Sequence, residues 1–345
     1  MTDRTGRHPI STVDPQISHG HSDPDQAAIQ DAMILLHLLA DGQPHPAAAL
    51  PGDWHASRLK GALDRLRGWG LGLIGDQAGM LQLERPVEPL AEERIVQDLP
   101  ADLRARLRLH VFPELDSTSA WLGRLACDSG EAACLAEHQS AGRGRRGREW
   151  RMPFGGGLAM SVRRDVSHWT GVPPRLTLAL GVALVEALDH EEIGLKWPND
   201  LVARGRKLGG ILVELRSREQ RSVLVAGVGL NVALSGDVAI DQPWIDLAGL
   251  MGADLPSRNA LAARLIQALS RALDDFCAQP AEALLERWSR YDVLFGLPVK
   301  VSSASGEILE GEARGVDSEG RLRLVGQGSE WLLDAGEVSV RRAMS

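Results

Sequence analysis

A glycine-arginine segment near the middle of the chain places the strongest constraint on the fold. Gly142, Gly144 and Gly147 match the dinucleotide-binding fingerprint G-x-G-x-x-G. That fingerprint requires a strand before the glycines and a helix that begins within them, so that the pyrophosphate meets the helix N-terminus. The preceding residues could form the strand, but residues 149–157 contain a proline and three consecutive glycines, which do not begin a helix. The segment therefore predicts a loop and excludes a Rossmann site.

The same loop concentrates positive charge in a chain whose formal net charge is -8. Five arginines lie between Arg143 and Arg151, interleaved with glycines. Glycines allow the backbone to approach a ligand closely, and the forked guanidinium groups suit phosphate or carboxylate. We expect a mobile anion-binding loop, with a solvated basic surface turn as the alternative.

Length and composition indicate a multidomain protein of the cytoplasm. The 345 residues suffice for two or three domains. No apolar run approaches the ~18 residues of a membrane span, and no basic segment followed by an apolar stretch opens the chain. Cys127, Cys134 and Cys277 lack metal-ligand spacing and are typical of reduced, buried thiols rather than nucleophiles.

The N-terminal part predicts a tail followed by a winged helix-turn-helix. Residues 1–25 are rich in Asp, His, Ser and Pro and are expected to be disordered. Within 26–86, apolar residues have helical spacing at 28–40 and 55–67, and a hairpin follows at 71–83. This is the element order of a winged helix-turn-helix. A small helical cap or a dimerisation module fits the same elements.

Charge does not decide between these interpretations. Neutralised phosphates supply most DNA affinity, and the second helix offers three basic candidates for DNA contact: Arg58, Lys60 and Arg65. From Asp41 to Arg85, however, five acidic residues balance five basic ones, and the hairpin tip lacks a basic residue. DNA binding and a purely structural role both stay open.

The rest of the chain predicts an α+β unit and a small β-barrel, joined to the N-terminal part by a linker at 84–109. Central strands are expected at 109–112, 132–138, 157–162, 208–215 and 223–232. Helices are expected after Ser117-Thr118-Ser119 and at 175–188, 259–277 and 281–291. Barrel strands are expected at 298–302, 308–313, 321–325 and 329–333, between glycine-containing turns.

Five motifs in this order resemble those of the biotin protein ligases, in particular their bifunctional branch of ligase and biotin operon repressor. The motifs are Asp116–Ser119, Glu137–Arg148, Lys196–Leu201, Arg206–Glu214 and Gly227–Asn231. The resemblance covers about residues 26–345 and is strongest from 111 to 235. It implies an α+β catalytic domain of the class II aminoacyl-tRNA-synthetase-like type at 87–293, after a winged helix-turn-helix domain at 26–86 and before an SH3-like β-barrel at 294–345.

The resemblance also implies a two-step reaction. Biotin and ATP form biotinyl-5′-adenylate and pyrophosphate, and a lysine of a biotin carboxyl carrier protein then attacks the adenylate. Because the biotin carboxylate and the α-phosphate are both anionic, the first step calls for fixed positive charge and Mg²⁺; the sequence identifies no protein ligand for the metal. The bifunctional branch implies operator DNA as a second partner and a homodimer formed with bound biotinyl-adenylate.

Individual roles follow from the same resemblance. Lys196, contacting the biotin carboxyl and α-phosphate oxygens, and Arg145 are expected to be catalytic. Residues matching biotin-binding positions are Ser117, Thr118, Ser119, Gln139, Arg143, Gly144, Arg145, Lys196, Gly227 and Gly229. Residues matching ATP or adenylate positions are Arg146, Arg148, Lys207, Asn231 and Trp244. Ser119 stands where the family usually has Asn; its shorter side chain puts its contact with biotin in doubt.

Alternatives remain for the activity and for single residues. A lipoate ligase or acyltransferase, or an ATP-independent biotin-binding module, would carry similar motifs. An isolated Lys196 would be a solvent-exposed lysine beside a core tryptophan, and Trp244 would be a core tryptophan rather than a cover for adenine.

Overall fold

The computed structural model describes residues 24–75, 79–126, 130–166, 169, 171–218, 221–234, 242–303, 308–335 and 338–342. The predicted tail and the tip of the N-terminal hairpin lie almost entirely outside these residues. Helix α1 begins at Pro24, inside the span expected to be tail. Within the described ranges, every helix is too short or too polar to cross a membrane.

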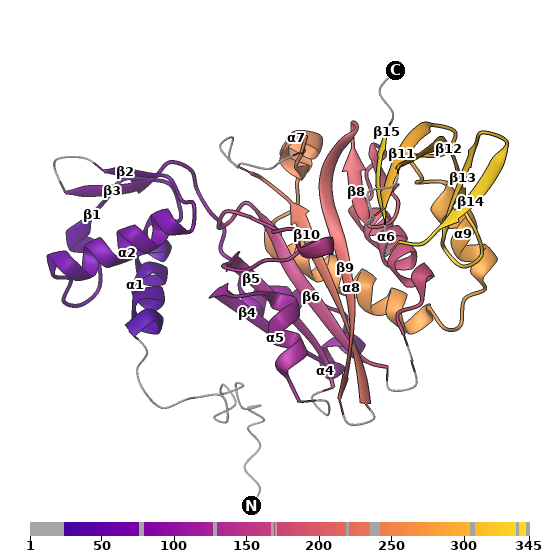
Figure 1. The fold of residues 1–345 in the computed structure, drawn as a ribbon. Helices are drawn as coiled ribbons and strands as arrows, with labels where there is room; N and C mark the ends of the chain where they lie inside the picture. The colour runs from indigo at the N-terminus through magenta and orange to yellow at the C-terminus, as the bar shows by residue number, and fades with distance from the viewer. Residues whose placement is uncertain are drawn as a thin grey trace, which may run out of the picture.

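The N-terminal unit consists of two helices packed against a three-stranded sheet (Figure 1). Its elements are α1 (Pro24–Leu39), β1 (His45–Pro46), η1 (Ala47–Ala49), α2 (Ala56–Gly68), β2 (Leu73–Gly75) and β3 (Met80–Leu83). Leu35, Leu36 and Leu39 of α1 are buried with Leu66 and Trp69 at the end of α2. The element order is the expected one, although the short middle helix of a winged helix-turn-helix is here the single 3-10 turn η1.

A seven-stranded sheet forms the centre of the molecule (Figure 1). Its strands are β4 (Leu107–Leu115), β5 (Glu131–Gln139), β6 (Gly157–Asp165), β7 (Ile193–Lys196), β8 (Asp200–Ala203), β9 (Arg206–Arg218) and β10 (Arg221–Asn231). The spatial order is β4-β5-β6-β10-β9-β8-β7, with every pair antiparallel except β4 with β5. Antiparallel pairing needs only short turns between β8, β9 and β10, whose sequences are nearly contiguous.

Alternating residues bury the two faces of this sheet against different helices. Ala132 and Cys134 of β5 pack toward α5 (Thr118–Arg124), whereas Ala133 and Leu135 join the core under α6 and α8. The helices on that second face are α3 (Glu92–Asp98), α6 (Pro174–Leu188) and α8 (Arg258–Asp275). The site is built on the α5 face. Cys134 is buried, which raises the pKa of its thiol and keeps it unreactive.

The expected linker at 84–109 contains two helices that the sequence analysis did not predict. They are α3 and α4 (Ala101–Arg106), separated by Pro100. Each has six or seven residues, which is too short for a helical period to stand out. Each nevertheless buries an apolar side chain, Ile95 or Leu103, in the main core, so this stretch is part of the central unit.

The C-terminal unit is a five-stranded antiparallel sheet in the order β14-β13-β12-β11-β15. Its strands are β11 (Pro298–Ser303), β12 (Ile308–Val316), β13 (Leu322–Gly326), β14 (Ser329–Leu333) and β15 (Val338–Arg342); β15 was not predicted. It follows α7 (Leu247–Met251), η3 (Gly252–Asp254) and α9 (Ala281–Ser289) in the chain. The connection between the units is direct, because Trp197 Nε1 donates to Gly320 O at 3.0 Å.

Candidate active site

A cavity of about 630 Å³ opens on the α5 face of the central sheet. It brings together all five motifs: the N-terminus of α5, the glycine-arginine loop, the β7–β8 turn, the strand β9 and the strand β10. The predicted residues that line it are Ser117, Thr118, Ser119, Gln139, Arg143, Gly144, Arg145, Arg146, Arg148, Lys196, Lys207, Gly227 and Gly229. Thirteen positions spread over more than 100 residues of sequence therefore meet at one place.

The glycine-arginine loop is a compact turn rather than an open strand. Gly144 N donates to Arg148 O at 2.7 Å and Trp150 N to Gly142 O at 2.9 Å. Arg146 at the tip has a φ of 58°, in the left-handed region. No helix follows, so the rejection of a dinucleotide fold at this loop agrees with the structure. The closed turn presents its arginines from one short segment.

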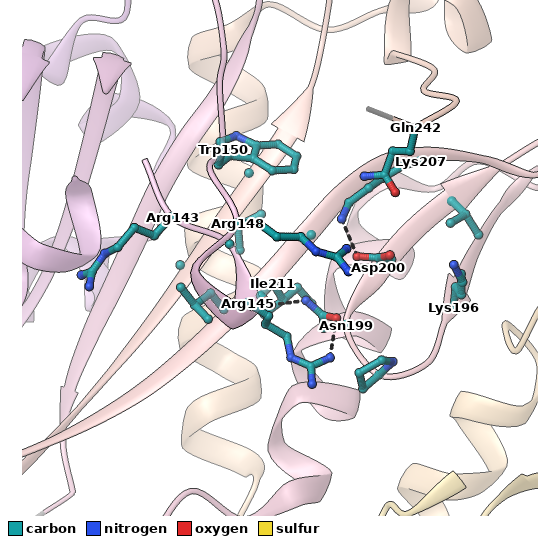
Figure 2. A pocket seen from close by; sticks show the side chains of 18 of the residues that line it. Arg143, Arg145, Arg148, Trp150, Lys196, Asn199, Asp200, Lys207, Ile211 and Gln242 are labelled. Carbon is teal, nitrogen blue, oxygen red and sulfur yellow. Dashed lines mark hydrogen bonds and ion pairs between the residues drawn. The ribbon is translucent and has the colours of Figure 1, made fainter. Parts of the chain in front are cut away.

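The arginines of the loop differ in their surroundings. Arg145 is half-buried and its Nη1 donates to Asn199 Oδ1 at 3.1 Å, while Asn199 Nδ2 donates to Ile211 O at 2.7 Å (Figure 2). Burial lowers the pKa of Arg145, although a guanidinium stays charged at any physiological pH. Arg143 is exposed, and its side chain extends away from the other arginines (Figure 2). Arg145 is thus a fixed cation and Arg143 an outer one.

A second cationic group comes from the opposite wall. Lys196 is the last residue of β7 and half-buried at the cavity. The peptide bond between Trp197 and Pro198 is cis, and buried Trp197 packs under the strand end. Lys207 on β9 pairs with Asp200 at 2.7 Å and lies over the Trp150 ring, 5.7 Å from its centroid (Figure 2).

The polar end of the cavity is lined by hydroxyl and amide groups. Ser117 caps α5, its side chain accepting from Ala120 N at 3.4 Å. Gln139 Oε1 accepts from Thr118 N at 2.8 Å and from Thr118 Oγ1 at 3.2 Å. Ser161 of β6 is fully buried and lies 2.8 Å from Thr118 Oγ1 and 3.0 Å from Ser119 Oγ. Ser119 therefore has a defined partner despite standing in place of Asn.

Two glycines on β10 make room for these groups. A Cβ at Gly227 would lie 2.7 Å from Ser119 Oγ, and a Cβ at Gly229 would lie 2.3 Å from the Trp150 ring. Both distances are below any real contact, so the side chains at these positions must be absent for the serine and the indole to sit where they do. The two glycines therefore leave space for the Ser119 and Trp150 side chains that line the cavity, as well as for a ligand.

Two predicted nucleotide-side residues do not line the cavity. Asn231 is buried, and its Nδ2 donates to Lys207 O at 3.3 Å and to Ile245 O at 3.1 Å. Trp244 is partly buried in a small apolar cluster with Met152. Both residues support the backbone at Lys207, which also exchanges hydrogen bonds with the segment around Trp244.

The three candidates for DNA contact have different partners. Arg58 donates from Nε and Nη2 to Asp31 at 2.9 and 2.7 Å. Arg65 pairs with Glu114 of β4 at 3.2 Å, and the same carboxylate accepts from Trp69 Nε1 at 2.7 Å. Lys60 is exposed. Two of the three therefore hold the N-terminal unit together or join it to the central sheet.

Other residues of the site were not singled out from the sequence. Asn199 and Asp200 lie within the Lys196–Leu201 motif, and Trp150 lies just after the Glu137–Arg148 motif, so these positions carried a signal. Ser161 lies in the middle of an apolar strand, where a lone serine carries no signal. Asp200 is a carboxylate that lines the cavity. Within the described ranges, no group of three or more His, Cys, Asp or Glu side chains is placed to hold a metal ion.

The sequence and the fold are similar to those of known proteins. The family model "Biotin/lipoate A/B protein ligase family" matches residues 116–231, and "Biotin protein ligase C terminal domain" matches 294–341. The bifunctional ligase/repressor BirA of Salmonella typhimurium is 35% identical over 90% of this chain and 98% of its own length. The biotin--[acetyl-CoA-carboxylase] ligase of Mycobacterium tuberculosis is 34% identical over 75% of this chain and 98% of its own. The structure of the Aquifex aeolicus biotin protein ligase in complex with biotin and ATP has a TM-score of 0.59 at 26% identity, covering 68% of this chain and 99% of that one.

Proposed function

This chain belongs to the biotin protein ligase family, and we propose that it forms biotinyl-5′-adenylate from biotin and ATP and transfers the biotinyl group to a lysine of a biotin carboxyl carrier protein, the reaction of a biotin--[acetyl-CoA-carboxylase] ligase. The observation that carries the proposal is one cavity that holds the glycine-arginine loop, Lys196, Lys207 and the polar end around Gln139. A carboxylate and an α-phosphate repel each other, and fixed cations on both sides of the cavity offset that repulsion in the transition state.

Residue roles follow from this placement. Lys196 and Arg145 bind the biotin carboxylate and the α-phosphate, because both lie half-buried at the cavity from opposite walls. Ser117, Thr118, Ser119 and Gln139 bind the ureido ring at the polar end. Arg146 and Arg148 cover the adenylate from the loop, and a closed loop keeps water from the mixed anhydride.

Nucleotide binding is assigned to the wall around Lys207. Its ammonium group lies between Asp200 and the Trp150 ring, where an adenine or phosphate would displace one of them. Asn231 and Trp244 act through the backbone of Lys207. Mg²⁺ commonly binds nucleotides through one or two carboxylates and the phosphates, and Asp200 is a carboxylate at this wall. The residues therefore fit a metal that arrives with ATP and neutralises phosphate charge.

The test is pyrophosphate exchange into ATP. Exchange should require biotin. Exchange that depends on lipoate or octanoate instead would assign the chain to a related group of acyl ligases or acyltransferases. Lys196→Ala and Arg145→Ala should each lower carrier biotinylation by at least about 100-fold with an unchanged circular dichroism spectrum. Lys300→Ala and Arg290→Ala, which remove exposed surface cations, are the matched controls. Turnover retained in the Lys196 or Arg145 variant would refute those roles.

A second function, repression of biotin-synthesis genes, is favoured by two observations. The Salmonella relative, a bifunctional ligase/repressor, is matched over 98% of its length, and the N-terminal unit has the element order of a winged helix-turn-helix. We propose that the chain binds operator DNA as a homodimer when biotinyl-adenylate is bound. A gel shift with a promoter fragment of biotin-synthesis genes and pre-formed adenylate tests this, and unaltered mobility at micromolar protein would reject it.

A further inference from the structure

The polar end of the cavity contains a chain of hydroxyl groups whose proton directions can be worked out. Gln139 Oε1 accepts from the Thr118 backbone N–H at 2.8 Å. A backbone N–H can only donate, so this contact fixes which end of the Gln139 amide is the oxygen. That oxygen can only accept. The Thr118 hydroxyl, 3.2 Å away, therefore donates its proton to Gln139.

The remaining directions follow one after another, since a hydroxyl has one proton. Thr118 Oγ1 has given its proton to Gln139, so across the 2.8 Å contact Ser161 must be the donor. Ser161 has then used its own proton, so across the 3.0 Å contact Ser119 must be the donor. The chain runs from Ser119 through Ser161 and Thr118 to Gln139. Ser161 is fully buried, so bulk water does not compete for its hydroxyl group.

The consequence appears at the open end of the chain. Ser119 lines the cavity, and with its proton committed to Ser161 it offers only lone pairs to a ligand. Ser117 differs, because its helix cap uses a lone pair and not the proton. The amide nitrogen of Gln139 also carries protons. The polar end therefore presents an acceptor at Ser119 and donors at Ser117 and Gln139.

We propose that Ser161 is a positioning residue that turns Ser119 into an obligate acceptor, which selects ligands with an N–H donor at that point. This rests on the proposed function, since the cyclic urea of biotin has two N–H donors beside a carbonyl acceptor and matches the pattern. Ser161 itself touches no ligand. Gly227, opposite Ser161 in the β6–β10 ladder, lets Ser119 approach: a Cβ there would lie 2.7 Å from Ser119 Oγ and 3.3 Å from Ser161 Oγ.

The test compares biotin with the two cyclic carbamates in which one ureido N–H is replaced by oxygen. In one of these carbamates the ring oxygen, a hydrogen-bond acceptor, replaces the N–H that would face Ser119. The wild-type protein should bind that carbamate at least about 30-fold more weakly than biotin, because two acceptors are left without a proton between them. In Ser161→Ala the Ser119 proton is released and can turn to the ring oxygen, so the preference should fall to within about 5-fold. Dissociation constants come from calorimetry in the absence of ATP, so that no adenylate forms.

Controls separate positioning from damage. A variant with a merely loosened pocket would weaken both ligands alike and keep their ratio. Ser222→Ala removes a buried hydroxyl from a similar pair, with Ser217 at 2.9 Å, at the far end of the sheet, and should keep the wild-type ratio. Should Ser161→Ala fail to fold, Ser119→Ala must show the same loss of preference. An unchanged ratio in either folded variant overturns the proposal, whereas a wild-type protein that binds no biotin overturns the proposed function instead.

Discussion

Replacing Glu137 by alanine should lower the free energy of unfolding of the central unit by much more than the loss of one exposed charge would. Glu137 lies on β5 with 2% of its side chain exposed, paired with Arg258 of α8 at 2.7 Å. Its carboxylate also accepts from Leu90 N at 2.6 Å and from Gly155 N at 3.4 Å. The Glu137 carboxylate thus joins three parts of the chain. It contacts α8 through Arg258, the stretch after the N-terminal unit through Leu90, and the segment after the glycine-arginine loop through Gly155.

The expected cost comes from the charge left behind. Arg258 is 8% exposed, and in Glu137→Ala its guanidinium keeps only carbonyl partners, Glu88 O and Gly157 O. Breaking a buried ion pair by removing one partner costs about 3–5 kcal/mol. At about 2–4 °C per kcal/mol for a unit of this size, the melting temperature should fall by roughly 6–20 °C. Urea denaturation followed by tryptophan fluorescence measures the free energy directly.

Two comparisons test the reasoning. Glu286→Ala breaks a pair with Arg290 that is 72% and 64% exposed and should cost under about 0.5 kcal/mol. The double variant Glu137→Leu/Arg258→Met leaves no buried charge and should recover part of the loss. A cost below about 1 kcal/mol for Glu137→Ala, or a double variant less stable than either single one, would refute the assignment of the cost to an uncompensated cation.

Three further outcomes are expected. Gly229→Ala should raise the KM for biotin and for ATP at least about tenfold, because the new Cβ displaces the Trp150 ring at the cavity wall; Gly171→Ala, with open space around its Cβ and no positive φ, is the control away from the cavity. Burial lowers the pKa of His138 in the folded protein, so as the pH falls below about 6.5 the unfolded chain is protonated before the folded one. The stabilisation by neutral His138 is therefore complete above that pH and is lost as the pH falls through the lower pKa of the folded state. His138→Gln should make the denaturation midpoint depend less on pH between pH 8 and 5. Arg58→Ala should lower the melting temperature of the N-terminal unit by removing the bidentate contact with Asp31, whereas exposed Lys60→Ala should leave it unchanged and weaken DNA retention; the reverse pattern would make Arg58 the DNA contact.

Residues whose role is set by local pattern were predictable from the sequence. Leucines four apart predicted α6, and the absent helix after Gly147 identified a loop rather than a dinucleotide site. The helix expected after Ser117-Thr118-Ser119 begins earlier, at Thr118, with Ser117 as its N-cap. The short helices α3 and α4 and the strand β15 carry too few residues for a period to show. Thirteen of the fifteen ligand-site positions predicted from the motifs line one cavity, because each motif lies at the start or the end of a strand or helix that borders it.

Partners distant in the sequence could not be predicted in this way. Ser161 pairs with Thr118 and Ser119 across 43 and 42 positions, and its immediate neighbours, Met160 and Val162, are both apolar. Asn231 was assigned to the nucleotide by motif, yet its amide is occupied by backbone carbonyls. A polar residue in a motif can bind the ligand directly, or it can hold the backbone of a residue that binds the ligand. Only its partners in the three-dimensional structure distinguish these two roles.

The same distinction limits how the N-terminal unit can bind DNA. Arg65 and Trp69 both donate to Glu114, so the C-terminal half of α2 is a contact between units rather than a free recognition surface. Arg58 is held by Asp31 at the N-terminal half, which leaves Lys60 as the exposed cation among the three predicted candidates. Arg67 near the end of α2 is also exposed but pairs with Asp64. Each phosphate contact adds about one to the slope of log affinity against log salt, so we predict that two copies on adjacent half-sites give about twice the slope of one copy. A slope that stays at the single-copy value would refute binding as a pair.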